Sequence, residues 1–99
     1  MALTYRLHFL AKQELTDAVD WYEKERKGRG GKFFMAYLTT LKRLIANPLN
    51  FPIDFDEVRK AHIPNFPYTI YYEVFGNDVF IYAIFHQKRY QEAWKDRIN

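Results

Sequence analysis

Three histidines, His8, His62 and His86, are the side chains of this sequence that titrate near neutral pH without a perturbing environment. Their spacing contains neither His-x-x-x-His nor Glu-x-x-His, so we expect no dedicated metal site and no cofactor. His86 differs from the other two because it ends the most hydrophobic stretch of the chain and opens the basic sequence of residues 86–89. We therefore take His86 as the candidate general acid or base. The alternative is a histidine that caps the end of a strand through a hydrogen bond.

Basic side chains gather late in the sequence, where they could stabilise negative charge or hold phosphates. Arg59 and Lys60 precede a predicted hairpin, and Lys88 and Arg89 follow it, so the hairpin can bring the two pairs to one end of a sheet. The alternative is a solubilising face, because acidic residues are interleaved with the basic ones near the C-terminus. A net charge of +3, from 15 Lys and Arg against 12 Asp and Glu, does not by itself indicate nucleic-acid binding.

The residue types that are absent exclude several kinds of chemistry. Without serine there is no serine triad, and with no cysteine there is no disulfide framework, thiolate zinc site or cysteine nucleophile. The glycines of residues 28–31 lack the preceding strand and the following Lys-Ser/Thr pair of a phosphate-binding loop. We find no signal peptide and no apolar run of about 18 residues, so we expect a cytoplasmic protein without a membrane partner.

Hydrophobic periodicity predicts the elements that position these side chains. Residues 3–10 alternate like a half-buried strand, with Leu3, Tyr5, Leu7 and Phe9 on one face. The period then becomes helical over residues 11–27, and the glycines of residues 28–31 end that helix. A second helix ends at Asn47-Pro48 and completes an αα-hairpin. The aromatic side chains Tyr5, Phe9, Phe34 and Tyr37 are expected in the core.

The composition of the second half of the chain predicts mainly strands. After a connector over residues 49–54, residues 55–63 form a weaker strand, and residues 68–75 and 79–85 form a hairpin around a type II′ turn at Gly76-Asn77. Both hairpin strands are apolar on both faces, so we expect the C-terminal segment or a partner to cover the face away from the helices. We interpret the surplus aromatic surface of these strands as a surface that awaits a partner. Residues 90–98 read as a short helix.

The 99 residues are too few for two hydrophobic cores. The order β-α-α-β-β-β-α predicts a single α+β domain over residues 1–99. In it an antiparallel sheet of about four strands packs on the N-terminal αα-hairpin.

Four motifs in this order resemble the RelE/ParE superfamily of bacterial toxins, and together they span almost the whole chain. They are Asp20-Trp21-Tyr22-Glu23 at the end of the first helix, Phe33-Phe34 at the start of the second, Phe66-Pro67-Tyr68 at the start of a strand, and residues 83–89 followed by Trp94 and Arg97. The resemblance implies a microbial-RNase-like fold. It also implies a toxin of a type II toxin–antitoxin module, which forms a hetero-oligomer with a small antitoxin that wraps an extended or helical segment around it.

The two branches of the superfamily imply different activities. RelE-type toxins cleave mRNA on the ribosome without a metal, and an arginine commonly begins the strand that Tyr68 begins here. Their C-terminal Arg and Tyr fall on Lys88 and Trp94, and a tryptophan cannot transfer a proton as a tyrosine can. His86 after Ala-Ile-Phe is more similar to the ParE branch, whose members poison DNA gyrase without cleaving RNA.

Three hypotheses follow from the resemblance. The favoured one is a toxin that binds a macromolecular target, DNA gyrase by family precedent, with Tyr68, Tyr71, Trp94 and Arg97 as contacts for target or antitoxin. The alternative is a metal-independent endoribonuclease that acts on mRNA at the ribosome, with His86 as acid or base and Arg59, Lys88 and Arg89 as charge stabilisers. A second alternative is an inert family member that acts only as a protein-interaction domain.

Overall fold

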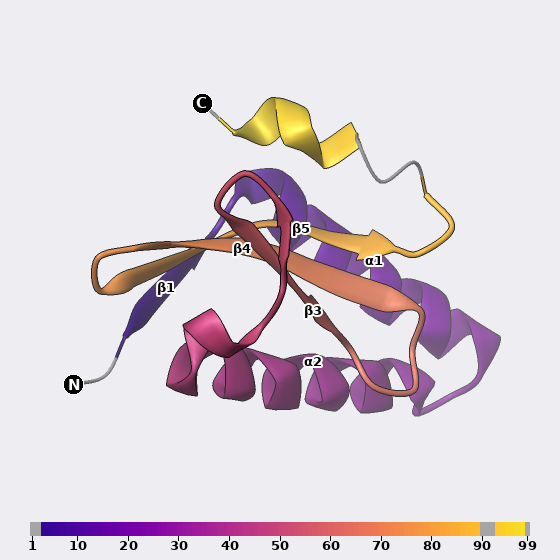
Figure 1. Cartoon of the computed structure of the whole chain (residues 1–99). Helices are drawn as coiled ribbons and strands as arrows, with labels where there is room; N and C mark the ends of the chain where they lie inside the picture. Colours follow the sequence, from indigo (N-terminus) through magenta and orange to yellow (C-terminus); the bar gives the residue numbers. More distant parts are fainter. Residues whose placement is uncertain (1–2, 90–92, 99) are drawn as a thin grey trace.

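The computed structural model describes residues 3–89 and 93–98, and it folds as a helical hairpin against a sheet (Figure 1). The α+β class and the αα-hairpin are confirmed. In chain order the elements are β1 (Thr4–Leu7), α1 (Phe9–Glu25), α2 (Arg29–Ala46), the 3-10 helix η1 (Pro48–Asn50), β2 (Ile53–Phe55), β3 (Val58–His62), β4 (Tyr68–Phe75), β5 (Asp78–His86) and the 3-10 helix η2 (Ala93–Arg97). Within the described residues, no helix is long and apolar enough to cross a membrane.

The sheet has five strands in the order β1-β5-β4-β3-β2, and it is mixed. Strands β2 to β5 pair antiparallel, but β1 lies parallel to β5, with Thr4 opposite Asp78 and Leu7 opposite Ile81. The prediction of about four antiparallel strands therefore missed β2 as a separate strand, because β2 spans the end of the expected connector and the start of the strand expected over residues 55–63, and it gave the wrong direction for β1. The β4–β5 turn agrees with the type II′ prediction, because Gly76 has a φ of +59° whereas Asn77 has no positive φ.

The first helix begins earlier than its hydrophobic pattern indicates. His8 is its N-cap, and the Nδ1 atom of His8 accepts a hydrogen bond from the Leu10 amide at 3.1 Å. Phe9 therefore lies in the first helical turn and is 73% exposed. Tyr5 and Phe34 are also exposed, so of the four aromatic side chains expected in the core only Tyr37 is buried.

The junction between α1 and α2 depends on a carboxylate. Glu23 accepts hydrogen bonds from the amides of Gly28 and Gly30, which satisfies two donors at the start of α2. Gly28 has a φ of +89°, and α2 then begins at Arg29 instead of after the glycines. A Cβ atom at Gly30 would lie 2.6 Å from the Val19 carbonyl oxygen, so Gly30 lets the two helices approach closely.

The sheet carries a hydrophobic core on each face. The larger core lies between the sheet and the helical hairpin, and the smaller one lies under the C-terminal segment (Figure 1). In the smaller core Trp94 of η2 covers Tyr71, Tyr82 and Phe85. The chain's own C-terminal segment therefore covers the second face, and the interpretation of the surplus strand surface as a surface that awaits a partner is wrong. The predicted helix over residues 90–98 is described only as η2, because residues 90–92 lie outside the described part.

Candidate functional site

The end of β5 places His86 at the mouth of a cavity. His86 lies opposite Tyr68 of β4, and the two rings meet edge to face with their centroids 5.1 Å apart. The Nδ1 atom of His86 accepts a hydrogen bond from the Lys88 amide at 3.0 Å, so His86 caps the strand end as the alternative interpretation expected. A neutral His86 ring with this bond carries its hydrogen on Nε2.

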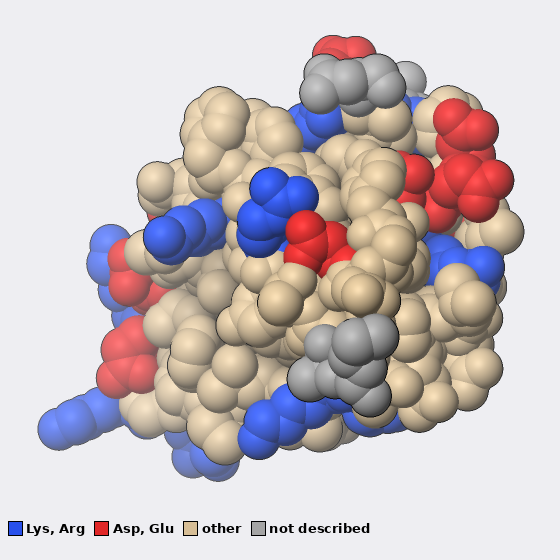
Figure 2. Space-filling view, turned by 90° about the vertical axis from the view of Figure 1, so that its left-hand side faces the viewer, with Lys and Arg blue, Asp and Glu red and all other residues tan. Residues whose placement is uncertain are grey.

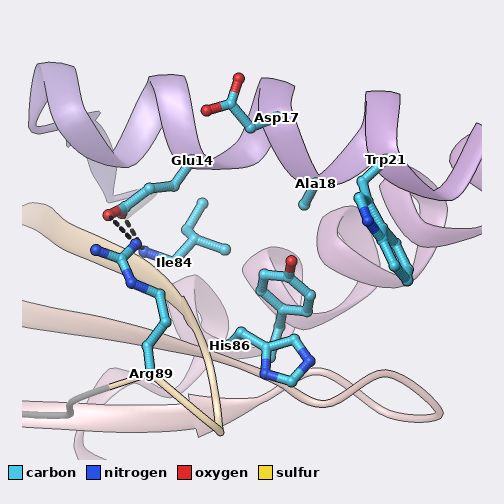
Figure 3. A pocket seen from close by; sticks show the side chains of 8 residues that line it. Glu14, Asp17, Ala18, Trp21, Ile84, His86 and Arg89 are labelled. Carbon is cyan, nitrogen blue, oxygen red and sulfur yellow. Dashed lines mark hydrogen bonds and ion pairs between the residues drawn. The ribbon is translucent and has the colours of Figure 1, made fainter.

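The cavity has a volume of about 320 Å³ and lies between α1 and the end of β5 (Figure 3). Trp21 extends from α1 towards His86, while Glu14 and Arg89 meet at the opposite end. Burial is the main cause that raises the pKa of the Tyr68 hydroxyl above its ordinary value. The lining residues are Glu14, Asp17, Ala18, Trp21, Tyr68, Ile84, His86 and Arg89.

Trp21 and Tyr22 divide between the surface and the core. Tyr22 is buried, whereas Trp21 is 55% exposed at the rim of the cavity. The sequence indicates this division, because adjacent positions of a helix face different sides. It does not indicate that Trp21 and His86 share one cavity, since that depends on how α1 crosses the sheet.

Glu14 is the central charged residue of this site, and sequence reasoning missed it. Its carboxylate accepts hydrogen bonds from the Ile84 amide at 3.1 Å, from Arg89 at 3.2 Å, and from both terminal nitrogens of Arg97 at 3.0 and 2.7 Å. The Glu14 and Arg97 side chains are only 13% and 9% exposed. Position 14 lies on the polar arc of an amphipathic helix, a pattern that also describes every solvated residue of α1.

Arg59 does not join His86, Lys88 and Arg89, contrary to the expectation that the hairpin gathers both basic pairs. Its guanidinium donates to the carbonyls of Leu49 and Phe51 at 3.2 and 2.6 Å. It pairs in register with Tyr72, four residues farther along β4 than the partner of His86, which is about 13 Å at the rise of a strand.

His62, and not Arg59, is the β3 residue that lies next to the segment after β5, because Gln87 Nε2 lies 3.5 Å from His62 Nδ1. His62 Nδ1 also lies 2.8 Å from the Thr69 hydroxyl. Among the described residues, no three His, Cys, Asp or Glu side chains are placed to hold a metal ion.

The four residues expected as target or antitoxin contacts separate into two groups. Tyr68 lines the cavity and is half-buried. Tyr71 and Trp94 stack on each other with centroids 4.6 Å apart in the smaller core, and Arg97 is held against Glu14. Tyr71 and Trp94 can touch a partner only if the C-terminal segment moves, so in this arrangement they are packing residues, whereas Arg97 is partly exposed.

A second candidate surface lies on the other flank of α1, between β1 and α2. It is a largely apolar groove of about 520 Å³ beside the open edge of β1. The Thr4 amide donates to the Asn77 carbonyl just before β5 and the His8 amide donates to the Ile81 carbonyl of β5, so by strand alternation the amides of Tyr5 and Leu7 face the open edge. The groove is lined by Tyr5, Arg6, Leu7, Lys12, Leu15, Phe34, Tyr37 and Leu38. Figure 2 views the molecule from the side on which β1 begins, where uncharged areas lie between scattered charged side chains.

Comparison with known proteins finds a matching family model and similar solved structures. Residues 5–90 match the family model described as the ParE toxin of the type II toxin–antitoxin system parDE. The fold matches a chain of a solved structure described as the chromosomal ParDE TA system from P. aeruginosa, with a TM-score of 0.75 and 17% sequence identity. That match covers 86% of this chain and 96% of the other, and at this identity the likeness concerns the fold. No curated protein matches the sequence.

Proposed function

Because this chain belongs to the family of ParE toxins of type II toxin–antitoxin systems, we propose that it arrests growth by binding a protein target and that a cognate antitoxin neutralises it. Family precedent gives DNA gyrase as the target. One observation favours binding over RNA cleavage: Arg59 lies about four strand residues from His86 and is engaged by backbone carbonyls. The residues proposed for a nuclease site are therefore not gathered around one reacting group.

The cavity between α1 and β5 is the surface we assign to the target. It combines an exposed tryptophan with Tyr68, His86 and Arg89, and buried tryptophan, tyrosine and arginine contacts carry much of the binding energy at protein interfaces. Its volume of about 320 Å³ is enough for one large side chain of a partner. Lys88, exposed just after β5, adds a positive charge beside it.

The groove beside β1 is the surface we assign to the antitoxin. An extended segment can add a strand to the open edge of β1, and an amphipathic helix can lay its apolar face in the groove between β1 and α2. Arg6 and Lys12 line the same groove, so carboxylates beside the apolar face of the segment would improve the fit.

The test uses the toxin purified with the small protein encoded by the adjacent gene and then freed from it. We expect the free toxin to inhibit gyrase supercoiling and to leave ribosome-bound mRNA intact, and we expect the antitoxin to reverse the inhibition. Codon-specific cleavage of mRNA would instead establish the endoribonuclease. Antitoxin binding with neither activity would establish an inert interaction domain.

Separate variants test the two surfaces. Trp21→Ala should weaken gyrase inhibition about tenfold or more and leave antitoxin affinity unchanged. Phe34→Glu places a charge in the groove and should weaken antitoxin binding by a similar factor. Met35→Glu is the matched control, because Met35 is 60% exposed on the same helix and does not line the groove. If Phe34→Glu and Met35→Glu bind antitoxin equally well, the assignment of the groove fails.

A further inference from the structure

The Glu14 carboxylate joins three parts of the chain that are far apart in the sequence. It contacts the edge of β5 at the Ile84 amide, the segment after β5 through Arg89, and η2 through Arg97. Arg97 also donates to the Tyr82 carbonyl at 2.8 Å, so the guanidinium fastens η2 to both α1 and β5. These contacts lie beyond the end of β1, where no strand among the described residues pairs with this edge of β5.

The Glu14 carboxylate compensates the positive charge of the Arg97 guanidinium. With its side chain 9% exposed, Arg97 would be left as a nearly buried, unpaired cation if Glu14 were neutral. The Ile84 amide would also lose a charged acceptor. The C-terminal segment can avoid both costs by leaving the sheet, which exposes Trp94 and Tyr71, and the loss of the carboxylate charge also removes an ion pair of Arg89, which lines the cavity.

We propose that Glu14 is a positioning residue for target binding, which holds Arg89 and the C-terminal segment of residues 93–98 in the arrangement that the target contacts. This rests on the proposed function. Glu14 faces β5, whereas the α1 side chains of the antitoxin groove, Lys12 and Leu15, lie on the other flank. Glu14 therefore controls contact with the target and leaves antitoxin binding unaffected.

The chain offers a direct reporter for the position of the segment. Trp94 is fully buried in η2 and Trp21 is largely exposed, so in a Trp21→Phe background the tryptophan fluorescence, excited selectively over that of tyrosine, comes from Trp94 alone. In that background Glu14→Gln should shift the emission to longer wavelength and increase quenching by acrylamide. The control is Asp20→Asn, the same change of acid to amide at an exposed position of α1 outside the cavity.

Activity is measured with Trp21 intact. Glu14→Gln should lose gyrase inhibition by about tenfold or more, while the Kd for the antitoxin changes by less than about threefold. Asp20→Asn should behave like the original protein in every assay. If Glu14→Gln does not fold by circular dichroism, Glu14→Asp, which keeps the charge on a shorter side chain, should give smaller changes in the same directions.

Two results overturn the proposal. Full inhibition by a variant whose Trp94 has become accessible would show that the target does not depend on the position of the segment. Lost inhibition with Trp94 still buried would make Glu14 a direct contact. If the unaltered toxin does not inhibit gyrase, the proposed target is wrong, and growth arrest in cells then replaces gyrase inhibition as the readout for Glu14→Gln.

Discussion

Replacing Trp94 tests whether the C-terminal segment is part of the folded core. Its side chain is fully buried, stacked on Tyr71 at 4.6 Å and on Tyr82 at 6.4 Å between centroids. Truncating a large aromatic side chain in a core costs about 3–5 kcal/mol. The indole Nε1 has no hydrogen-bond partner among the described residues, and a buried unpaired donor costs about 1–3 kcal/mol. Because Trp94→Ala also removes that donor, we expect it to lower the free energy of unfolding by about 2–4 kcal/mol.

Trp94→Phe separates the two contributions. It removes the unpaired N–H group and keeps most of the ring stacking, so we expect the free energy of unfolding to change by less than about 1 kcal/mol. Trp21→Ala is the control for losing a tryptophan at an exposed position, and we expect it to cost less than about 1 kcal/mol.

Urea denaturation followed by far-ultraviolet circular dichroism gives the midpoint and slope without using tryptophan as the probe. Equal destabilisation by Trp94→Ala and Trp21→Ala would show that η2 does not pack on the sheet in solution. If Trp94→Phe costs as much as Trp94→Ala, the indole N–H makes a hydrogen bond that stabilises the fold, and the argument from the unpaired donor fails.

Three further predictions concern the stability of the fold. Gly30→Ala should destabilise the protein by about 1–3 kcal/mol, because the new Cβ would lie 2.6 Å from a backbone carbonyl of α1. At Gly31 a new Cβ meets nothing within 4 Å, so Gly31→Ala should stabilise α2 by about 0.5–1 kcal/mol. If both variants shift the urea midpoint in the same direction, this reasoning is refuted. Tyr72→Phe should cost about 1 kcal/mol at pH 7, since the hydroxyl donates to the Pro48 carbonyl at 2.6 Å, and an unchanged midpoint would count against that bond. Burial raises the pKa of Tyr37 and Tyr72 to about 12, so between pH 10 and 12 the unfolded chain loses protons that the folded chain keeps. The free energy of unfolding should therefore fall as pH rises through this window, less steeply in Tyr72→Phe, and an equal slope in both proteins would contradict the assignment.

Local pattern predicted the elements that depend on local physics. Helical spacing located the two helices, and alternation with β-branched and aromatic residues located the β4–β5 hairpin and its Gly76-Asn77 turn. The boundaries of α1 were less predictable, because a hydrogen bond to the His8 ring starts the helix before its apolar pattern begins.

The parts of the structure that the sequence did not predict depend on distant pairing. Nothing in residues 4–7 indicates that β1 lies parallel to β5 more than seventy positions later. The separation of Arg59 from His86 follows from the β3–β4 register, which composition does not determine. Glu14 was missed for a related reason: its partners Arg89 and Arg97 come to it only when η2 folds back over the sheet.

The aromatic residues, 19% of the chain, include a buried group on the sheet and an exposed group beside the two cavities, and the exposed group bears on how the toxin works. The sheet needs no partner to cover its second face, because Trp94 covers Tyr71, Tyr82 and Phe85 there. Exposed aromatic side chains lie beside both cavities, with Trp21 on one flank of α1 and Phe34 of α2 with Tyr5 of β1 on the other. An antitoxin seated at Phe34 does not need to occupy the cavity at Trp21. Neutralisation then requires the antitoxin to reach around α1, to block the target by its bulk, or to shift the segment that Glu14 holds. In the Trp21→Phe background, an antitoxin that shifts the segment should make Trp94 accessible to acrylamide, whereas the other two routes should leave it buried.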